Sequence, residues 1–107
     1  MPIIRIDYDN EEITRENMVF LSNALQKIIS EATKIEDVFV YANSSEIKIK
    51  IAPIEVFVEM SAHKINNIDN LLKEIKDKIK NRKNDNNFEE KINLTIIPIH
   101  RKMEIGI

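Results

Sequence analysis

Residues 53–60, PIEVFVEM, decide the fold because they repeat a pattern that the chain has already used at residues 2–8, PIIRIDY. In both stretches a proline is followed by alternating side chains, which is typical of a strand with one buried face. The alternate apolar residues of the two stretches are Ile4, Ile6, Tyr8, Ile54, Val56, Val58 and Met60. The offset of about fifty positions indicates an internal duplication, which is a period at which repeats are common.

A helix is predicted after each of these strands. Thr14 is a suitable N-cap for a helix that reaches about Ala32, and Asn66 or Asn67 can cap the second helix. Apolar residues recur at helical spacing in both segments, and such a stripe faces a core. The two stripes consist of Met18, Leu21, Leu25, Ile28, Ile29 and Ala32, and of Ile68, Leu71, Leu72, Ile75 and Ile79.

Three further segments have the composition of strands. We expect these strands at residues 37–42, 46–51 and 91–97. The segment 46–51 would form a hairpin after the turn Asn43-Ser44-Ser45, and Pro98 would end the last strand. The tail from His100 to Ile107 has little pattern and could add one short strand.

The order of elements predicts an α/β (α+β) fold in a single domain over residues 1–107, with repeat units at about 1–51 and 52–107. Right-handed crossovers would pair the strands of each unit in parallel and place both helices on one face of a mixed four-stranded sheet. No further helix is available to cover the other face. We therefore expect the protein to oligomerise through its sheet.

Composition excludes several classes of function. The 107 residues include 16 basic and 18 acidic side chains, a net charge of −2 that does not favour a nucleic-acid partner. The absence of cysteine excludes disulfides, thiol catalysis and cysteine-based metal sites. His63 and His100 have no partner at metal-ligand spacing, so no metal site is expected.

The remaining charge and hydropathy patterns point to an ordinary soluble protein. The basic tract from Lys73 to Lys83 includes Glu74 and Asp77 and lies late in a predicted helix, which favours a solvated helix face. The N-terminus lacks the features of a signal peptide, and no stretch approaches the roughly 18 apolar residues that span a bilayer. A cytoplasmic location without a membrane partner is the expectation.

Pro2 directly after Met1, at the start of a duplicated β-α-β chain, resembles the tautomerase superfamily. Its members include 4-oxalocrotonate tautomerase, 5-carboxymethyl-2-hydroxymuconate isomerase and macrophage migration inhibitory factor. The resemblance covers nearly the whole chain in the order of its elements. It implies that the initiator methionine is removed, that the secondary amine of Pro2 becomes the catalytic group, that no cofactor is used and that the protein is a homotrimer.

Two more stretches resemble the migration inhibitory factor branch. Residues 32–38, ATKIEDV, are similar to the family's helix end, where a lysine, here Lys34, precedes the second strand. Residues 61–65, SAHKI, are similar to a segment that brings a backbone N–H, here that of Ala62, and a lysine, here Lys64, near the proline. The chain differs from the family in having one glycine, and no late aromatic residue matches the family's.

The chemistry of such a site follows from the amine. An α-amino group has a pKa of about 7.7–8.0, and partial burial with neighbouring cations would lower it. It could then act as a general base or, protonated, as a general acid on a small carboxylated keto–enol compound. Cationic side chains would hold the carboxylate and stabilise an enolate, and the candidates are Lys34, Lys64, Arg5 and Arg101.

Other interpretations remain open at this stage. Pro2 could simply begin a strand, where its missing N–H costs nothing. The protein could be a non-catalytic assembly or partner-binding protein with the same fold. A ferredoxin-like βαββαβ binding module shares the order of elements, but RNA-binding versions need exposed aromatic side chains on central strands. The six aromatic residues fall at predicted core positions, which argues against RNA binding.

Overall fold

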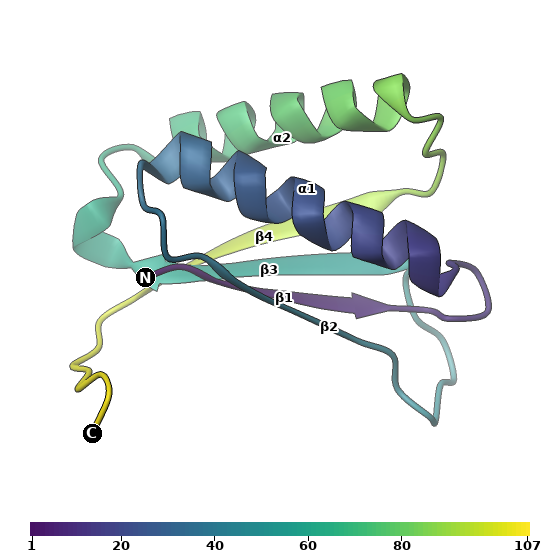
Figure 1. Ribbon diagram of the computed structural model, residues 1–107, viewed down its shortest axis with the longest axis horizontal. Helices are drawn as coiled ribbons and strands as arrows, with labels where there is room; N and C mark the ends of the chain where they lie inside the picture. Colours follow the sequence, from purple (N-terminus) through teal and green to yellow (C-terminus); the bar gives the residue numbers. More distant parts are fainter.

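A computed structural model describes residues 1–107. The elements are β1 (Ile3–Tyr8), α1 (Arg15–Thr33), β2 (Phe39–Asn43), β3 (Ile54–Ser61), the 3₁₀ turn η1 (Ala62–Lys64), α2 (Ile68–Asp85) and β4 (Ile92–Ile99). Both helices lie on one face of the sheet, and the chain leaves the other face open (Figure 1). No helix is long and apolar enough to cross a membrane.

The sheet has four strands in the order β2-β1-β3-β4. β1 pairs in parallel with β2 and β3 pairs in parallel with β4, while β1 and β3 are antiparallel at the centre. The duplicated β-α-β prediction and the mixed four-stranded sheet are therefore confirmed. A ferredoxin-like module has an antiparallel sheet, so this topology excludes that interpretation.

Caps and apolar stripes explain where the helices form. The Thr14 side chain accepts a hydrogen bond from the Asn17 N–H at 3.1 Å, and the Asn67 side chain accepts one from the Asn70 N–H at 3.0 Å. The core lies between the helices and the alternate residues of β1 and β3, and Ile4, Ile6, Leu25 and Ile75 are among its fully buried members. Ile68 and Leu72 depart from the predicted buried stripe of α2, because they are 41 % and 38 % exposed.

Two strand predictions need correction. Residues 46–51 form no strand, and Lys48 instead donates to Asp9 at 3.1 Å and to the side chain of Asn10. The alternation of isoleucine and lysine gives this segment a strand pattern, but no strand of the same chain pairs with it. β4 continues through Pro98 to Ile99, because an edge strand tolerates a residue without an N–H. The tail after Ile99 adds no strand.

The aromatic prediction is also wrong for the open face of the sheet. Phe39 and Tyr41 on β2 are 45 % and 57 % exposed, and Phe57 on β3 is half-buried. The register places Tyr41, Arg5 and Phe57 side by side across three strands. The same face carries Asp7, which pairs with Arg5.

Candidate functional site

Pro2 lies immediately before β1 and is fully buried. Its carbonyl accepts a hydrogen bond from the Phe39 N–H at 3.2 Å, which fixes the start of β1 against β2. The register of β1 with β3 pairs Ile3 with Glu59, so its continuation sets Pro2 opposite Met60. Met60 is buried on the helix-covered face of the sheet. The proline ring therefore belongs to the same end of the core as Met60.

Met60 is also part of a cavity of about 330 Å³, which we call the Lys34–Lys64 pocket. The pocket lies where α1 ends and α2 begins, and its wall brings together residues that are far apart in the sequence. The lining residues are Ala32, Thr33, Lys34, Met60, Lys64, Ile65, Asn66, Asn67, Asn70, Leu71 and Glu74. Pro2 is not among them.

Local backbone geometry positions both lysines. Lys34 is the C-cap of α1 in the left-handed conformation, with φ 62°, and its N–H donates to the Ser30 carbonyl at 2.9 Å. Lys64 ends η1, the 3₁₀ turn that connects β3 to the loop before α2. Glycine or asparagine is usual at a left-handed C-cap, so a lysine there is an unusual choice. Strain of this kind is often found at functional sites.

The pocket favours an anion. Neither Lys34 nor Lys64 takes part in any of the three ion pairs of the structure, which leaves both ammonium groups without a carboxylate partner. The N-terminus of α2, capped by Asn67, also lines the pocket, and its dipole attracts negative charge. Glu74 is the one acidic residue in the lining. A small carboxylate fits these groups.

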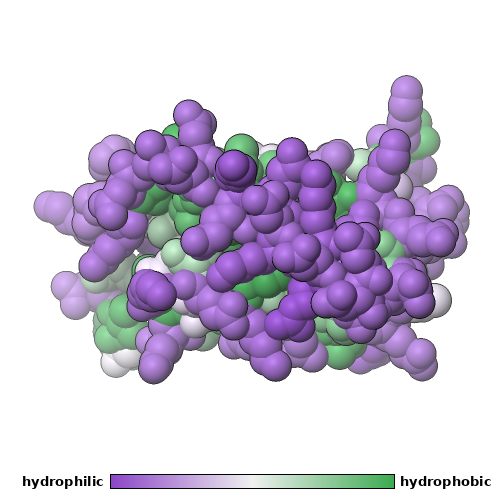
Figure 2. Space-filling view, turned by 90° about the horizontal axis from the view of Figure 1, so that it is seen from above, coloured by the Kyte–Doolittle hydropathy of each residue, from purple (hydrophilic) through white to green (hydrophobic).

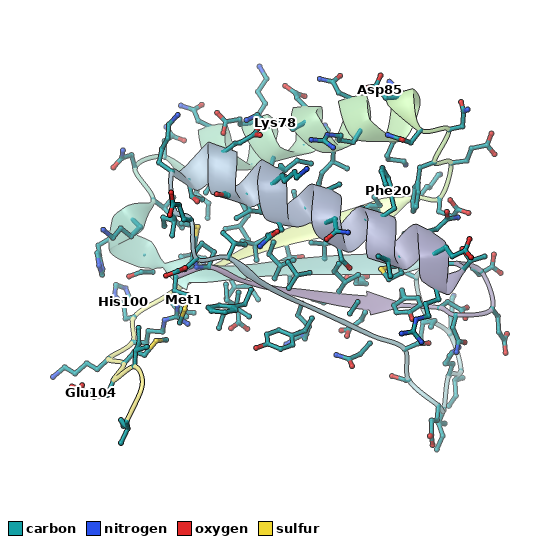
Figure 3. All side chains as sticks on the ribbon, viewed as in Figure 1. Met1, Phe20, Lys78, Asp85, His100 and Glu104 are labelled. Carbon is teal, nitrogen blue, oxygen red and sulfur yellow. The ribbon has the colours of Figure 1, made fainter.

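Arg101 contacts the peptide bond between Met1 and Pro2. Its guanidinium donates a hydrogen bond to the Met1 carbonyl, so the tail after β4 and the N-terminus meet at one end of the sheet (Figure 3). Adding the bond lengths of the peptide to this contact sets the guanidinium within about 5 Å of the Pro2 nitrogen. Arg101 thus lies close to that nitrogen.

Like Pro2 and Arg101, the predicted site residues Arg5 and Ala62 do not line the pocket. Arg5 points to the open face of the sheet, where it is 4.6 Å from the centre of the Phe57 ring and 3.6 Å from an Asp7 carboxylate oxygen. Ala62 begins η1 and is half-exposed, without lining the cavity. Sequence reasoning missed Asn70 and Glu74, although both follow Asn67 at helical spacing on the first turns of α2.

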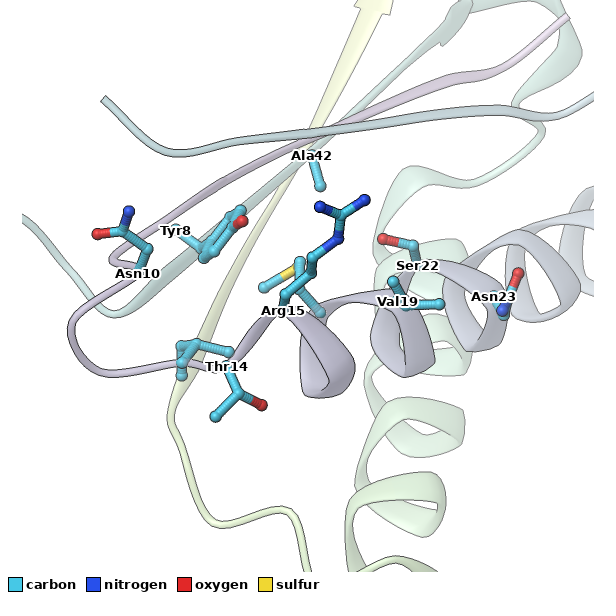
Figure 4. A pocket seen from close by; sticks show the side chains of 10 residues that line it. Tyr8, Asn10, Thr14, Arg15, Val19, Ser22, Asn23 and Ala42 are labelled. Carbon is cyan, nitrogen blue, oxygen red and sulfur yellow. The ribbon is translucent and has the colours of Figure 1, made fainter. Parts of the chain in front are cut away.

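A larger cavity, of about 620 Å³, opens at the opposite end of β1 between Tyr8, the start of α1 and Ala42 of β2. Figure 4 shows the Arg15 guanidinium reaching across it toward Ala42. None of the predicted site residues lines this cavity. No cluster of three or more His, Cys, Asp or Glu side chains is arranged to hold a metal ion.

Comparison with known proteins identifies the fold. No protein-family profile and no curated protein sequence matches this chain. Among solved structures, FG41 malonate semialdehyde decarboxylase inhibited by 3-bromopropiolate superposes with a TM-score of 0.74 at 16 % identity, over 98 % of this chain and 89 % of that one.

Two other solved structures also superpose on this chain. Macrophage migration inhibitory factor from Oncomelania hupensis matches with a TM-score of 0.55 at 23 % identity, over 92 % of this chain and 74 % of that one. RhCC from Rhodococcus jostii RHA1 matches with a TM-score of 0.53 at 11 % identity, over 98 % of this chain and 84 % of that one. All three have tautomerase-superfamily folds. The resemblance predicted from the sequence is confirmed at the level of the fold.

Proposed function

We propose that this chain, with its tautomerase-superfamily fold, is a cofactor-free tautomerase or related isomerase that acts on a small carboxylated keto–enol compound. The amine of Pro2, freed by removal of Met1, is its general acid and base. One observation carries the proposal: the buried Pro2 lies opposite Met60, a wall of the pocket in which Lys34 and Lys64 stand without carboxylate partners.

The surroundings of Pro2 favour the uncharged, proton-accepting form of its amine near neutral pH. Removal of Met1 frees the guanidinium of Arg101 from its carbonyl partner and leaves it near the new amine. A cation at that distance disfavours the ammonium form, as does burial of the ring. Both effects lower the pKa of the amine from the ordinary range of an N-terminus, so the free base is present at neutral pH.

The reaction is a proton transfer between oxygen and carbon. For an enol acid, the Pro2 nitrogen accepts the proton of the enol hydroxyl, and the resulting enolate takes a proton at its carbon from the ammonium or from water. The C=C double bond becomes a single bond and the C–O bond becomes C=O, without net oxidation. Lys34 and Lys64 hold the carboxylate and stabilise the charge of the enolate.

Kinetics with phenylenolpyruvate test this mechanism. Protein that begins at Pro2 should ketonise the compound, and Pro2→Ala should lower the rate without abolishing it, because a primary amine remains. Lys34→Ala and Lys64→Ala should mainly raise KM, each by about tenfold or more if a charged hydrogen bond is lost. Lys50→Ala, a change of the same charge on an exposed loop, is the matched control. Malonate semialdehyde is a second compound to assay, because a protein with the same fold is named for it.

We also propose a homotrimer. The open face of the sheet exposes Phe39 and Tyr41, and the loop after β2 exposes Ile47 and Ile49 by 86 % and 98 %. Apolar side chains exposed on one side of a sheet are typical of an interface between chains. The mixture of Arg5 with carboxylates on this face suits a second copy of the chain better than a polyanion. Sedimentation is the direct test.

A non-catalytic binding protein is the second candidate. It is favoured by the contact between Arg101 and the Met1 carbonyl, which holds an unprocessed N-terminus in place. On that account Met1 is retained and the amide nitrogen of Pro2 has no basic lone pair. The protein then does not ketonise phenylenolpyruvate, and Arg101→Ala only loosens the N-terminus. A loss of ketonisation in the Pro2-started Arg101→Ala protein supports the enzyme instead.

A further inference from the structure

A groove of about 290 Å³ runs between α2 and β4, away from the Lys34–Lys64 pocket. The two cavities share no lining residue. The groove is lined by Lys76, Ile79, Lys80, Lys83, Lys91, Ile92, Asn93 and Leu94. Half of these residues are lysines and none is acidic, so the groove is the most basic of the cavities described here.

The lysines of the groove lack carboxylate partners. The ion pairs of the structure involve Lys48, Lys78 and Arg5, and none involves a lysine of the groove. The basic tract of α2 is therefore divided: Lys78 faces α1, where it meets Glu31 at 3.5 Å, while its neighbours along the helix line the groove. Lysines at i, i+4 and i+7 repel one another on one helix face, and a bound anion would relieve that repulsion.

Spacing along the helix suits an extended anion. Lys76 and Lys83 are seven residues apart, which is about 10.5 Å along the axis at the α-helical rise. Three cations in a row over this length suit an anion with two linked charged groups, such as a diphosphate, better than an anion with one. Lys91 precedes β4 and approaches from the opposite wall, so cations flank the groove on both sides.

The floor of the groove is apolar. Ile79 is 6 % exposed, and Ile92 and Leu94 are half-buried members of the surface that packs on the core. Seen from above the helices, hydrophilic side chains cover most of the molecule, and apolar atoms appear in the hollows between them (Figure 2). Cations around an apolar floor can bind both the charged and the uncharged part of one ligand.

We propose that the α2–β4 groove binds a small molecule that carries a diphosphate or a comparably extended anion joined to a planar or apolar group, as in a nucleoside diphosphate. The row of lysines contacts the phosphates, and Ile79, Ile92 and Leu94 contact the apolar group. A nucleic acid is disfavoured, because the chain carries a net charge of −2 and its basic groups form one short row.

Titration calorimetry with ADP, inorganic pyrophosphate and adenosine tests the proposal on the full chain. ADP and pyrophosphate should bind at one site per chain and weaken as salt is raised, and adenosine should not bind measurably. ADP alone should shift the NMR signals of the methyl groups of Ile79, Ile92 and Leu94. The proposal would be overturned if ADP and pyrophosphate both failed to saturate the protein up to about 1 mM. It would also be overturned if adenosine bound as tightly as ADP.

Matched variants separate this groove from general charge attraction. Lys80→Gln with Lys83→Gln should weaken ADP binding by about tenfold or more, since charge-assisted hydrogen bonds are lost. Lys27→Gln with Lys50→Gln removes the same charge elsewhere and should change the affinity by less than about twofold. Equal losses in the two proteins contradict the proposal, as does saturable binding of a ten-nucleotide oligo(dT) without binding of ADP. Phenylenolpyruvate ketonisation should be the same in both variants, which keeps this groove distinct from the Pro2 site.

Discussion

Replacing Lys34 by glycine should stabilise the fold and weaken the candidate site at the same time. Lys34 caps α1 with φ 62°, a conformation that costs an L-residue about 1–2 kcal/mol and that glycine adopts freely. The capping hydrogen bond from its N–H to the Ser30 carbonyl uses only the backbone, so the variant keeps it. The lysine side chain, in contrast, is one of the two unpaired cations of the Lys34–Lys64 pocket.

The size of the gain follows from two opposing terms. Glycine relieves the left-handed strain, but it loses about 0.5–1 kcal/mol more conformational free energy on folding than alanine does. The remainder is a net stabilisation of about 0.5–1 kcal/mol. For a domain of this length it corresponds to a rise in Tm of about 2–8 °C.

Thermal and urea unfolding, followed by circular dichroism, measure this gain. Lys34→Ala is the key comparison, because it removes the same side chain and keeps the strain. Asn87, with φ 53°, is a second control, since asparagine tolerates this conformation and Asn87→Gly should gain less. If Lys34→Gly is no more stable than Lys34→Ala, the strain argument is wrong. If both variants ketonise phenylenolpyruvate as well as the parent protein does, Lys34 is not a substrate ligand.

Three other predictions concern stability and assembly. Leu25→Ala should lower the free energy of unfolding by about 2–5 kcal/mol, because Leu25 is fully buried, whereas Leu72→Ala should lower it by less than about 1 kcal/mol. Equal costs of the two variants in urea unfolding would contradict the assignment of buried and exposed helix faces. The Glu11 N–H and Lys48 hold the pKa of Asp9 below its usual range. The ionised Asp9 carboxylate therefore stabilises the fold above about pH 4, and this stabilisation is lost as pH falls through the lowered pKa. Below about pH 4 the parent protein should therefore lose stability more steeply than Asp9→Asn, and parallel curves would refute this. Sedimentation should give a trimer that Tyr41→Asp dissociates, and a stable monomer of the parent protein would end the trimer proposal.

The parts of the fold that could be predicted are those with one buried face. The alternation at residues 2–8 and 53–60 reproduced β1 and β3, because every second side chain of these strands enters the core. Thr14 was predicted correctly as a cap, since a side-chain oxygen bonding to nearby N–H groups depends on local sequence alone.

The errors have a common physical cause. An apolar pattern in the sequence indicates a helix or strand face, but it does not show which other element, if any, packs against that face. Residues 46–51 alternate as a strand does, yet Ile49 is 98 % exposed because no strand of the same chain pairs with that segment. Phe39 and Tyr41 were expected in the core and lie on the open face, because an aromatic strand has two faces and this sheet covers one. Leu72 extended an apolar stripe past the edge of the surface that α1 and the sheet bury.

The candidate site was predictable only in part. Lys34 and Lys64 were picked out by resemblance, and the structure brings them to one pocket although thirty positions separate them. Arg5 was a candidate for its charge alone, although the alternation of Ile4 and Ile6 already sets it on the opposite strand face, where the structure places it. Asn70 and Glu74 enter through the packing of α2 beside η1, which is a tertiary feature.

The central claim is that the Pro2 amine performs the chemistry, and one measurement tests it directly. A preparation that retains Met1 is treated with methionine aminopeptidase, and aliquots are taken for intact mass and for the rate of phenylenolpyruvate ketonisation. The account predicts that the rate rises in proportion to the fraction of chains that begin at Pro2, from a background rate at zero removal. A rate that is the same before and after removal of Met1 would contradict it.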